Sequence, residues 1–238
     1  MMSLSLPVAF MAPGALFGID LGSGSRSGSD MTAPLQIVLL LTALTLLPAI
    51  LMSITPFLRI TLVLHFLRQA LGTQTAPSNQ VLLGIALFLT MALMRPTASE
   101  MLEQGWAPYQ EGRISREQAW QRGTDPLRRH LLRFAREKDL ALMVEISHRP
   151  SPARPSDMGL ELLVPAYVLS ELKAGFQIGA VLFLPFLIID LVVASVTLSM
   201  GMVQLPPVMI SAPFKILLFV LADGWHLVVG GLLRSFAS

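Results

Sequence analysis

The chain has 238 residues, of which 53% are apolar and only 13% are charged, whereas about 25% charged residues is usual for a soluble domain. It contains no cysteine, which excludes a disulfide framework and a thiolate metal site. The formal net charge of +2 is too small to indicate a nucleic-acid partner, and no basic stripe is interleaved with aromatic residues.

Residues 1–30 are predicted to be a leader followed by a linker. Residues 4–17 are moderately apolar but are interrupted by two prolines, and Arg26 is the first basic residue. Because a secretory signal normally begins with a basic region, we interpret this segment as a degenerate signal or a poorly placed start. Residues 22–30 have the Gly/Ser-rich composition of a linker.

Residues 31–95 are predicted to form the N-terminal apolar helices. Three apolar stretches follow one another, at residues 35–52, 57–71 and 79–94. The second stretch carries Arg59 and Arg68, and the third is closed by Arg95 and Pro96. The third stretch has 16 residues, slightly fewer than the ~20 that a straight helix needs to span hydrocarbon.

Residues 96–164 are predicted to form a polar, charged helical segment. Residues 95–164 hold 11 of the 17 Lys and Arg and 10 of the 15 Asp and Glu. Asp125 followed by Pro126 indicates a helix start. Leu127, Leu131 and Phe134 then fall on one face at helical spacing. We therefore expect a water-exposed amphipathic helix here.

Residues 165–238 are predicted to form a kinked helical hairpin. Residues 165–200 are one apolar stretch with Pro185 inside it. A helix of this length would measure about 54 Å, longer than a ~30 Å hydrocarbon core. A break at residues 201–207 separates it from the last apolar run at residues 208–233. With no internal repeat and no strand alternation, the predicted fold is all-α: a membrane-associated protein of long kinked helical hairpins.

Catalytic and metal-binding motifs are missing from the sequence. The histidines stand far apart, at His65, His130, His148 and His226. There is no paired metal-ligand spacing, phosphate loop or nucleophile elbow. We therefore expect no catalytic residue, no metal and no cofactor. A membrane-bound enzyme, as an alternative, would need convergent titratable groups.

Three ionisable residues, Asp190, Lys215 and Asp223, lie in apolar surroundings, and each one needs a partner. A charge at membrane depth costs at least ~2.5–3.5 kcal/mol, so it is normally paired, buried in protein or placed in a watery cavity. Lys215 and Asp223 are eight residues apart, hence about 80° apart around a helix and about 12 Å along it. They cannot pair directly. Lys215 therefore needs a carboxylate from another segment, with Glu171 and Asp190 as candidates, or one from another chain.

Two interpretations of these buried charges remain open. Either they bridge helices or subunits, or each one extends to an interface or finds a water molecule. Asp223 lies three residues before His226, so these two side chains can meet on one helix face.

The segment from Met200 to Pro207 cannot be a continuous helix, because it contains Gly201 and ends in two prolines. Irregular backbone between apolar segments is tolerated where protein buries it or where it lines a cavity. Methionine is flexible enough to close around an irregular object, so a ring of such loops would form a soft seal. The alternatives are a simple hairpin tip and a small transporter with broken helices around a midplane site.

Four stretches of the chain resemble the FliP family of flagellar export-gate proteins and its counterparts in virulence-associated type III secretion. They are residues 45–59 (TLLPAILMSITPFLR), 70–90 (ALGTQTAPSNQVLLGIALFLT), 165–191 (PAYVLSELKAGFQIGAVLFLPFLIIDL) and 201–230 (GMVQLPPVMISAPFKILLFVLADGWHLVVG). The resemblance covers residues 35–238. It implies a non-enzymatic pentamer that joins FliQ and FliR in a helically arranged gate, near FlhA and FlhB, and passes unfolded flagellar proteins outward.

The resemblance also implies a location and roles for individual residues. The protein would be a multi-pass protein of the bacterial inner membrane, facing the periplasm, in the flagellar basal body. Glu171 and Lys215 match charged positions that the family uses between neighbouring subunits, with Asp190 and Asp223 as further buried ionisable groups. Met202, Val203 and Gln204 match a methionine gasket that closes the pore, although some relatives have three successive methionines there. The counterpart subunit of a virulence system and a solute transporter acting alone are the alternative functions.

Overall fold

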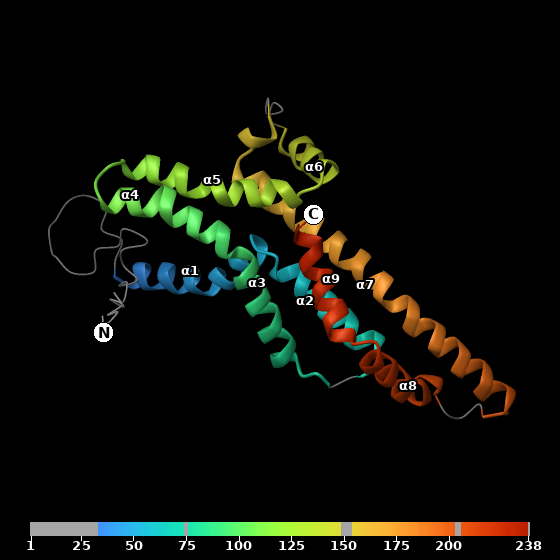
Figure 1. Cartoon of the computed structure of the whole chain (residues 1–238). Coiled ribbons are helices and arrows are strands. Elements are labelled where there is room, and N and C mark those ends of the chain that lie inside the picture. Colours follow the sequence, from blue (N-terminus) through green and yellow to red (C-terminus); the bar gives the residue numbers. More distant parts are fainter. Residues whose placement is uncertain (1–32, 74–75, 149–153, 203–205, 238) are drawn as a thin grey trace, which may run out of the picture. The chain divides into compact units, whose positions relative to one another are not determined.

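The computed structural model describes residues 33–73, 76–148, 154–202 and 206–237, and every element within these ranges is a helix (Figure 1). This confirms the predicted all-α fold. The predicted leader and linker at residues 1–30 lie outside the described residues. The chain divides into two compact units, residues 1–46 and residues 47–238, and most of the structure belongs to the second.

Helix α1 (Ala33–Ser53) begins in the first unit and carries no charged residue. Its large apolar side chains are exposed on all sides, as at Leu39 and Leu44. The hydroxyls of Thr42, Thr45 and Ser53 donate to backbone carbonyls three or four residues earlier, at 2.7–2.9 Å. A helix whose surface is apolar and whose hydroxyls are satisfied internally is suited to lipid or to apolar protein surroundings.

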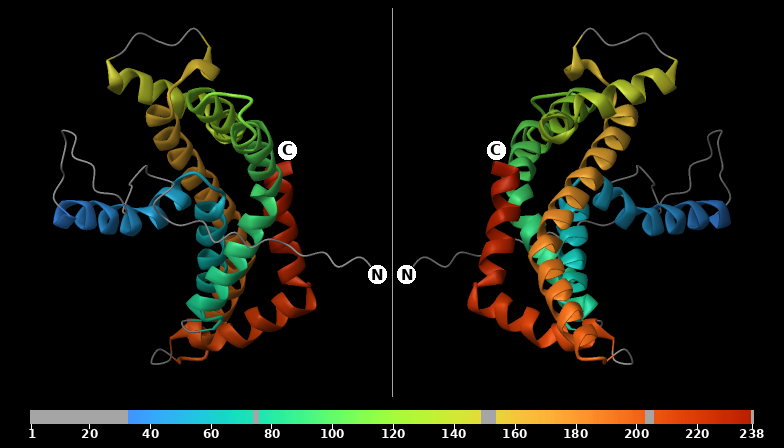
Figure 2. Two further views of the ribbon diagram at one scale, coloured as in Figure 1. Left: turned by 90° about the vertical axis from the view of Figure 1, so that its left-hand side faces the viewer. Right: turned by 90° about the vertical axis from the view of Figure 1, so that its right-hand side faces the viewer.

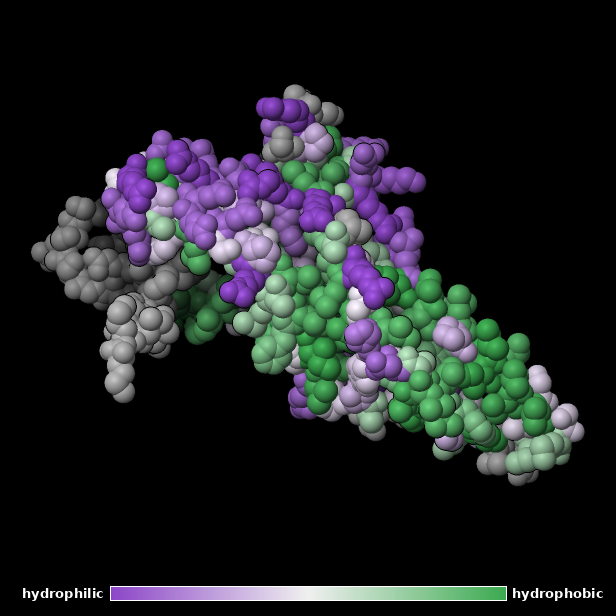
Figure 3. Space-filling model, in the orientation of Figure 1, coloured by the Kyte–Doolittle hydropathy of each residue, from purple (hydrophilic) through white to green (hydrophobic). Residues whose placement is uncertain are grey.

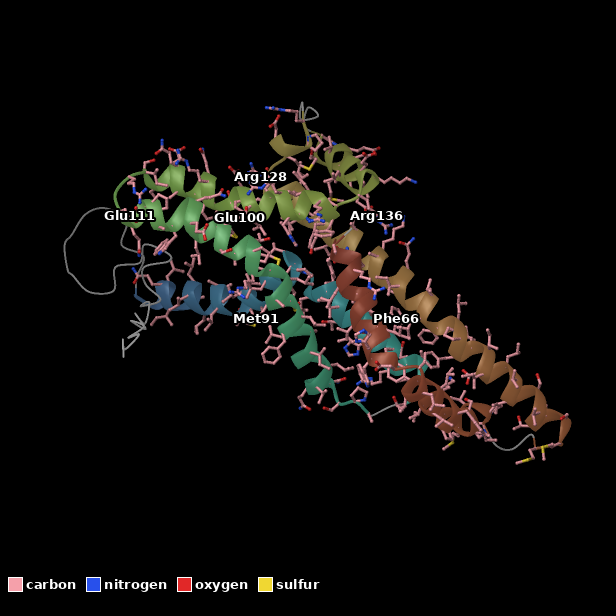
Figure 4. The ribbon with its side chains drawn as sticks, viewed as in Figure 1. Phe66, Met91, Glu100, Glu111, Arg128 and Arg136 are labelled. Carbon is pink, nitrogen blue, oxygen red and sulfur yellow. The ribbon has the colours of Figure 1, made fainter. Side chains whose placement is uncertain are left out.

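Helix α2 (Phe57–Ala70) lies at the centre of the second unit, between α3 (Asn79–Met101) and α7 (Leu160–Ser199). It buries a stripe at helical spacing: Ile60, Val63, Leu64 and Leu67. Helices α2 and α7 approach closely because α7 has no side chain at Gly179, where an added Cβ would come within 2.3 Å of the Phe66 ring. Phe66 instead packs edge-on against Phe176 and Phe183, with ring centroids 5.4 and 6.0 Å apart (Figure 4).

Helix α3 continues through Arg95 and Pro96 to Met101, so the predicted end at residue 94 is wrong. Proline removes one backbone hydrogen bond and bends a helix without always ending it, and Figure 1 shows α3 bending along its length. A π-helical turn, η2 (Leu102–Trp106), and the short α4 (Ala107–Gln110) follow. The end of α3, η2 and α4 form one side of a polar arm, which comprises residues 97–134.

Helix α5 (Arg116–Phe134) forms the other side of the arm and begins nine residues before the predicted start at Asp125. The Ser115 hydroxyl accepts from the Gln118 amide, and the Gln118 side chain accepts from the Ser115 amide. This capping box starts the helix upstream, and Pro126 is then carried inside it. The predicted apolar face is confirmed, because Leu127 and Leu131 are buried.

Helix α6 (Glu137–Ser147) and a 3-10 turn, η3 (Pro155–Asp157), connect the arm to α7. Both helices α5 and α6 pack on the first turns of α7, around Leu163 and Tyr167. Helix α7 is 40 residues long and contains Pro165 and Pro185, so it starts five residues earlier than predicted.

The predicted last apolar run is two helices, α8 (Pro207–Leu221) and α9 (Gly224–Ala237), which meet at an angle of 67°. Figure 2 shows α9 turning back along the bundle toward the polar end of this unit. In the part of the chain that the structure describes, three helical segments are long and apolar enough to cross a membrane, within residues 35–53, 79–110 and 160–199, and the bent pair α8–α9 would be a fourth. Figure 3 shows the apolar surface over α7 and α8 and the polar surface over α5.

Candidate functional site

The hairpin formed by α7 and α8 contains the residues that the sequence analysis singled out. Asp190 on α7 accepts from two groups of α8: the Ser211 hydroxyl at 2.5 Å and the Lys215 ammonium at 2.6 Å. The two partners lie one turn apart on α8, so the carboxylate bridges them with its two oxygens. These bonds fix the register of the hairpin, in which α7 ends at Ser199 and α8 begins at Pro207.

Lys215 is buried among apolar residues, with only 3% of its side chain exposed, whereas 29% of the Asp190 side chain is exposed. Its neighbours on α8 include Phe214 and Ile216, which are exposed apolar side chains. Of the two candidate carboxylates in the chain, the structure selects Asp190. Glu171 lies 19 residues earlier on the same helix, about 28 Å away along the axis.

Glu171 pairs with Arg59 on α2 instead. The Arg59 Nε donates to Glu171 Oε2 at 2.9 Å, and its Nη2 donates to Oε1. Both residues are buried, at 5% and 0% exposure. Such a two-pronged arginine–carboxylate pair is among the strong, geometrically specific ion pairs.

The pairing of Arg59 was missed from the sequence, although Arg59 was noted on an apolar helix. The signal that could have found it is the same cost argument that singled out Lys215, because an arginine between apolar neighbours also needs a buried carboxylate. Arg59 also donates from Nη1 to the carbonyl and hydroxyl oxygens of Ser235, at 3.3 and 3.2 Å. One guanidinium therefore connects α2, α7 and α9.

The start of the predicted gasket ends α7 in a regular C-terminal cap. The amide of Gly201 donates to Leu198 and that of Met202 to Thr197, both at 3.0 Å. Gly201 has a φ of 75°, the left-handed conformation that this cap requires and that glycine adopts without strain. The side chains of Met200 and Met202 are exposed, by 68% and 39%. Val203 and Gln204 lie outside the described residues.

Asp223 is exposed in the turn between α8 and α9, so it is not the buried carboxylate that was expected within a single chain. It has a φ of 49°, a conformation that aspartate tolerates better than most residues. Its carbonyl accepts from the Leu227 amide at 3.1 Å, at the first turn of α9. A carboxylate at the N-terminus of a helix is favoured by the helix dipole, which accounts for its position there. His226, the partner considered for it, is exposed as well.

The polar end of the second unit contains one histidine with a perturbed pKa. Burial, and then the nearby charges of Arg133 and Arg59, lower the pKa of His130 to about 4. Its Nε2 is buried and has no hydrogen-bond partner among the described residues, and the same holds for the Tyr167 hydroxyl; the two rings lie 6.2 Å apart. On the same side of the bundle, Arg136 at the start of α6 donates to Gln177 of α7 at 2.6 Å (Figure 4).

Among the described residues, no group of three or more histidines or carboxylates is placed to hold a metal ion. The buried charges of the candidate site form two ion pairs, Arg59 with Glu171 and Lys215 with Asp190. What the arrangement can do is hold a hairpin with an apolar exterior and a methionine-bearing tip in one register. Such an element is suited to packing against other apolar helices.

Comparison with known proteins gives consistent matches along the chain. A sequence model of the FliP family matches residues 40–232. The flagellar biosynthetic protein FliP of Pectobacterium carotovorum subsp. carotovorum is 48% identical over 238 residues, which cover 99% of this chain and 92% of that protein. The protein of the same name from Bacillus subtilis (strain 168) is 48% identical over 212 residues, 89% of this chain and 96% of the relative. That from Borreliella burgdorferi is 42% identical over 215 residues, 89% of this chain and 85% of the relative.

Proposed function

The chain belongs to the FliP family, and from this membership we propose that it is a core subunit of the flagellar type III protein-export gate. In this role it forms part of the channel through which unfolded flagellar axial proteins leave the cell. The reported relatives are all flagellar biosynthetic proteins, which favours the flagellar role over the counterpart in a virulence system.

The observation that carries the proposal is the α7–α8 hairpin. Its walls are held in register by the Asp190–Lys215 pair, its outer surface is apolar, and its tip presents exposed methionines. In a single chain the apolar surface of the hairpin stays uncovered, whereas a ring of neighbouring copies would bury the apolar faces of α7 and α8 and bring the tips together. The flexible methionine side chains then form the seal.

The exposed apolar surface of α7 supports assembly with neighbours. Among its exposed large side chains are Val181, Leu184, Leu187, Ile188, Leu191 and Val192. A group of exposed large apolar side chains on one helix marks contact with protein or membrane. We propose a pentamer that joins FliQ and FliR, with FlhA and FlhB nearby, as a multi-pass assembly of the bacterial inner membrane in the flagellar basal body. The polar end formed by α5 and α6 faces the periplasm.

Glu171 and Lys215 support this assembly through the helices that they position. Each one is buried in an ion pair within its own chain, so we propose that they set the position of the α7 and α8 surfaces that neighbouring subunits contact. Direct pairing between Glu171 of one subunit and Lys215 of the next is the competing arrangement, and charge exchange distinguishes the two.

Lys215→Glu places two carboxylates side by side and should weaken oligomerisation, as measured by native mass spectrometry of the detergent-extracted complex. If the pair within the chain positions the subunit, Asp190→Lys added to Lys215→Glu restores the assembly, whereas Glu171→Lys added to it does not. If Glu171→Lys added to Lys215→Glu restores the assembly and Asp190→Lys added to it does not, the intersubunit pair is established instead. Wild-type assembly in Lys215→Glu would end both arrangements.

The seal is tested by the ion permeability of proteoliposomes that contain the gate. Replacing Met202 and Val203 by glycine should make the vesicles leaky to small ions, because the apolar closure is lost. Met91→Gly is a matched control, because Met91 is an exposed methionine on α3, away from the hairpin tip (Figure 4). Tight vesicles with the double glycine variant, or equal leakage with the control, would count against the seal.

A further inference from the structure

Helix α9 buries few of its residues against the rest of its unit. It is joined to α8 through a turn of two residues, where Asp223 is in the left-handed region. Of its 14 residues, only Gly224, Leu232 and Phe236 are buried. The first half of the helix is only partly covered: Trp225 packs edge-on against Phe219 and Val228 contacts two core clusters, whereas Leu227 is exposed.

The end of α9 lies in a polar site that two arginines provide. The last carbonyls of a helix have no donor within the helix and need one from elsewhere. Arg59 on α2 donates to the Ser235 carbonyl at 3.3 Å, and Arg133 on α5 donates to the Ala237 carbonyl at 3.3 Å. Both positive charges also lie at the negative end of the helix dipole, where cations are favoured.

Arg59 is built into the core independently of α9. Its Nε and Nη2 are committed to Glu171, which leaves Nη1 as the donor directed at Ser235. Its guanidinium carbon lies 4.1 Å from the centre of the Phe236 ring, a cation–π distance. The paired guanidinium therefore offers one free N–H donor to Ser235 and its cationic face to the Phe236 ring, both at the C-terminal end of α9.

We propose that α9 is a strap that opens separately from the rest of the chain, and that Arg59 is the positioning residue that holds it closed. The hinge is the turn at Ala222 and Asp223, and the clamp is the contact of Arg59 with Ser235 and Phe236. The strap itself does not depend on the proposed function, but its consequence does. Because α9 follows directly on α8, its closure restrains the C-terminal end of α8, the helix that carries Lys215.

The test is hydrogen exchange of the full-length chain in lipid nanodiscs, followed by mass spectrometry of its peptides. In the wild-type chain, the amides of α9 exchange faster than those of α2 and α5. In Arg59→Gln, exchange of α9 accelerates at least a further tenfold while α5 keeps its protection. Arg59→Lys keeps the charge without the forked geometry and gives an intermediate rate. Arg68→Gln is the matched control, because Arg68 lies on the same helix but is hydrogen-bonded to Asn79 and His65.

A second variant separates opening of the strap from general loss of the fold. Arg59→Met with Glu171→Met removes both charges, so that no unpaired charge is buried, and it should still accelerate exchange in α9 alone. Because the chain has no cysteine, Ser235→Cys gives a single thiol, which should react with maleimide at least tenfold faster when Arg59 is replaced. Unchanged α9 exchange, or equal acceleration in every helix, would overturn the proposal. These readouts do not depend on protein export, so failure of the proposed function would leave them unaffected.

Discussion

Removing the carboxylate of Asp190 should destabilise the chain more than removing the ammonium of Lys215, although the two groups form one pair. Asp190→Asn leaves Lys215 as a charge with 3% of its side chain exposed, and stranding a buried charge typically costs about 3–5 kcal/mol. Lys215→Met leaves Asp190 hydrogen-bonded to Ser211 and with 29% of its side chain exposed. We therefore expect a smaller loss of roughly 1–2 kcal/mol from that change.

The double variant, Asp190→Asn with Lys215→Met, should regain most of the loss. Replacing a buried pair by neutral groups of similar volume is often neutral, so its free energy of unfolding should lie within about 1 kcal/mol of the wild type. The measurement is unfolding of the purified chain in mixed micelles by detergent titration, followed by far-UV circular dichroism. The reasoning is refuted if Lys215→Met is the more damaging single change, or if the losses of the two single variants add in the double variant.

Further predictions concern the α2–α7 packing, the Tyr167 hydroxyl and the His130 imidazole. Tyr167→Phe should leave the free energy of unfolding unchanged or raise it by about 1 kcal/mol, because the buried hydroxyl meets no partner in the described part of the chain; a clear loss in the same titration would reveal a hidden hydrogen bond. Gly179→Leu should separate α2 from α7 and prevent stable folding, since even a Cβ would approach the Phe66 ring within 2.3 Å; a wild-type melting curve would contradict this packing. His130, with a pKa lowered to about 4 in the folded chain, should contribute stability that is fully present above pH ~6.5 and is lost as the pH falls through 4, by about 3 kcal/mol in total. In His130→Gln this part of the pH dependence disappears, and an unchanged pH profile would show that His130 is not the group responsible.

The helical class and the hairpin were predictable from the sequence because they depend on local chemistry. The apolar runs, the two prolines after the hairpin tip and the glycine at position 201 each limit the backbone without reference to distant residues. The same holds for the amphipathic face through Leu127 and Leu131, which is buried as expected. The demand of Lys215 for a carboxylate was also predictable, since it follows from the cost of an unpaired charge.

Which carboxylate meets Lys215 could not be predicted, because the choice between Asp190 and Glu171 depends on how α7 and α8 align in space. The same limit applies to the pairing of Arg59 with Glu171, which are 112 residues apart. The errors at helix ends have a local origin. Asp125 followed by Pro126 predicts a helix start, whereas the capping box at Ser115 starts the helix earlier and Pro126 lies inside it.

The central claim, that this chain is one subunit of a multimeric gate, is tested most directly by its native mass after gentle detergent extraction from the cell. The account predicts a complex several times the 25.9 kDa of the chain, containing several copies together with smaller membrane partners. A stable single copy with Lys215 reactive toward amine-specific reagents in water would contradict both the assembly and the buried pair on which it rests.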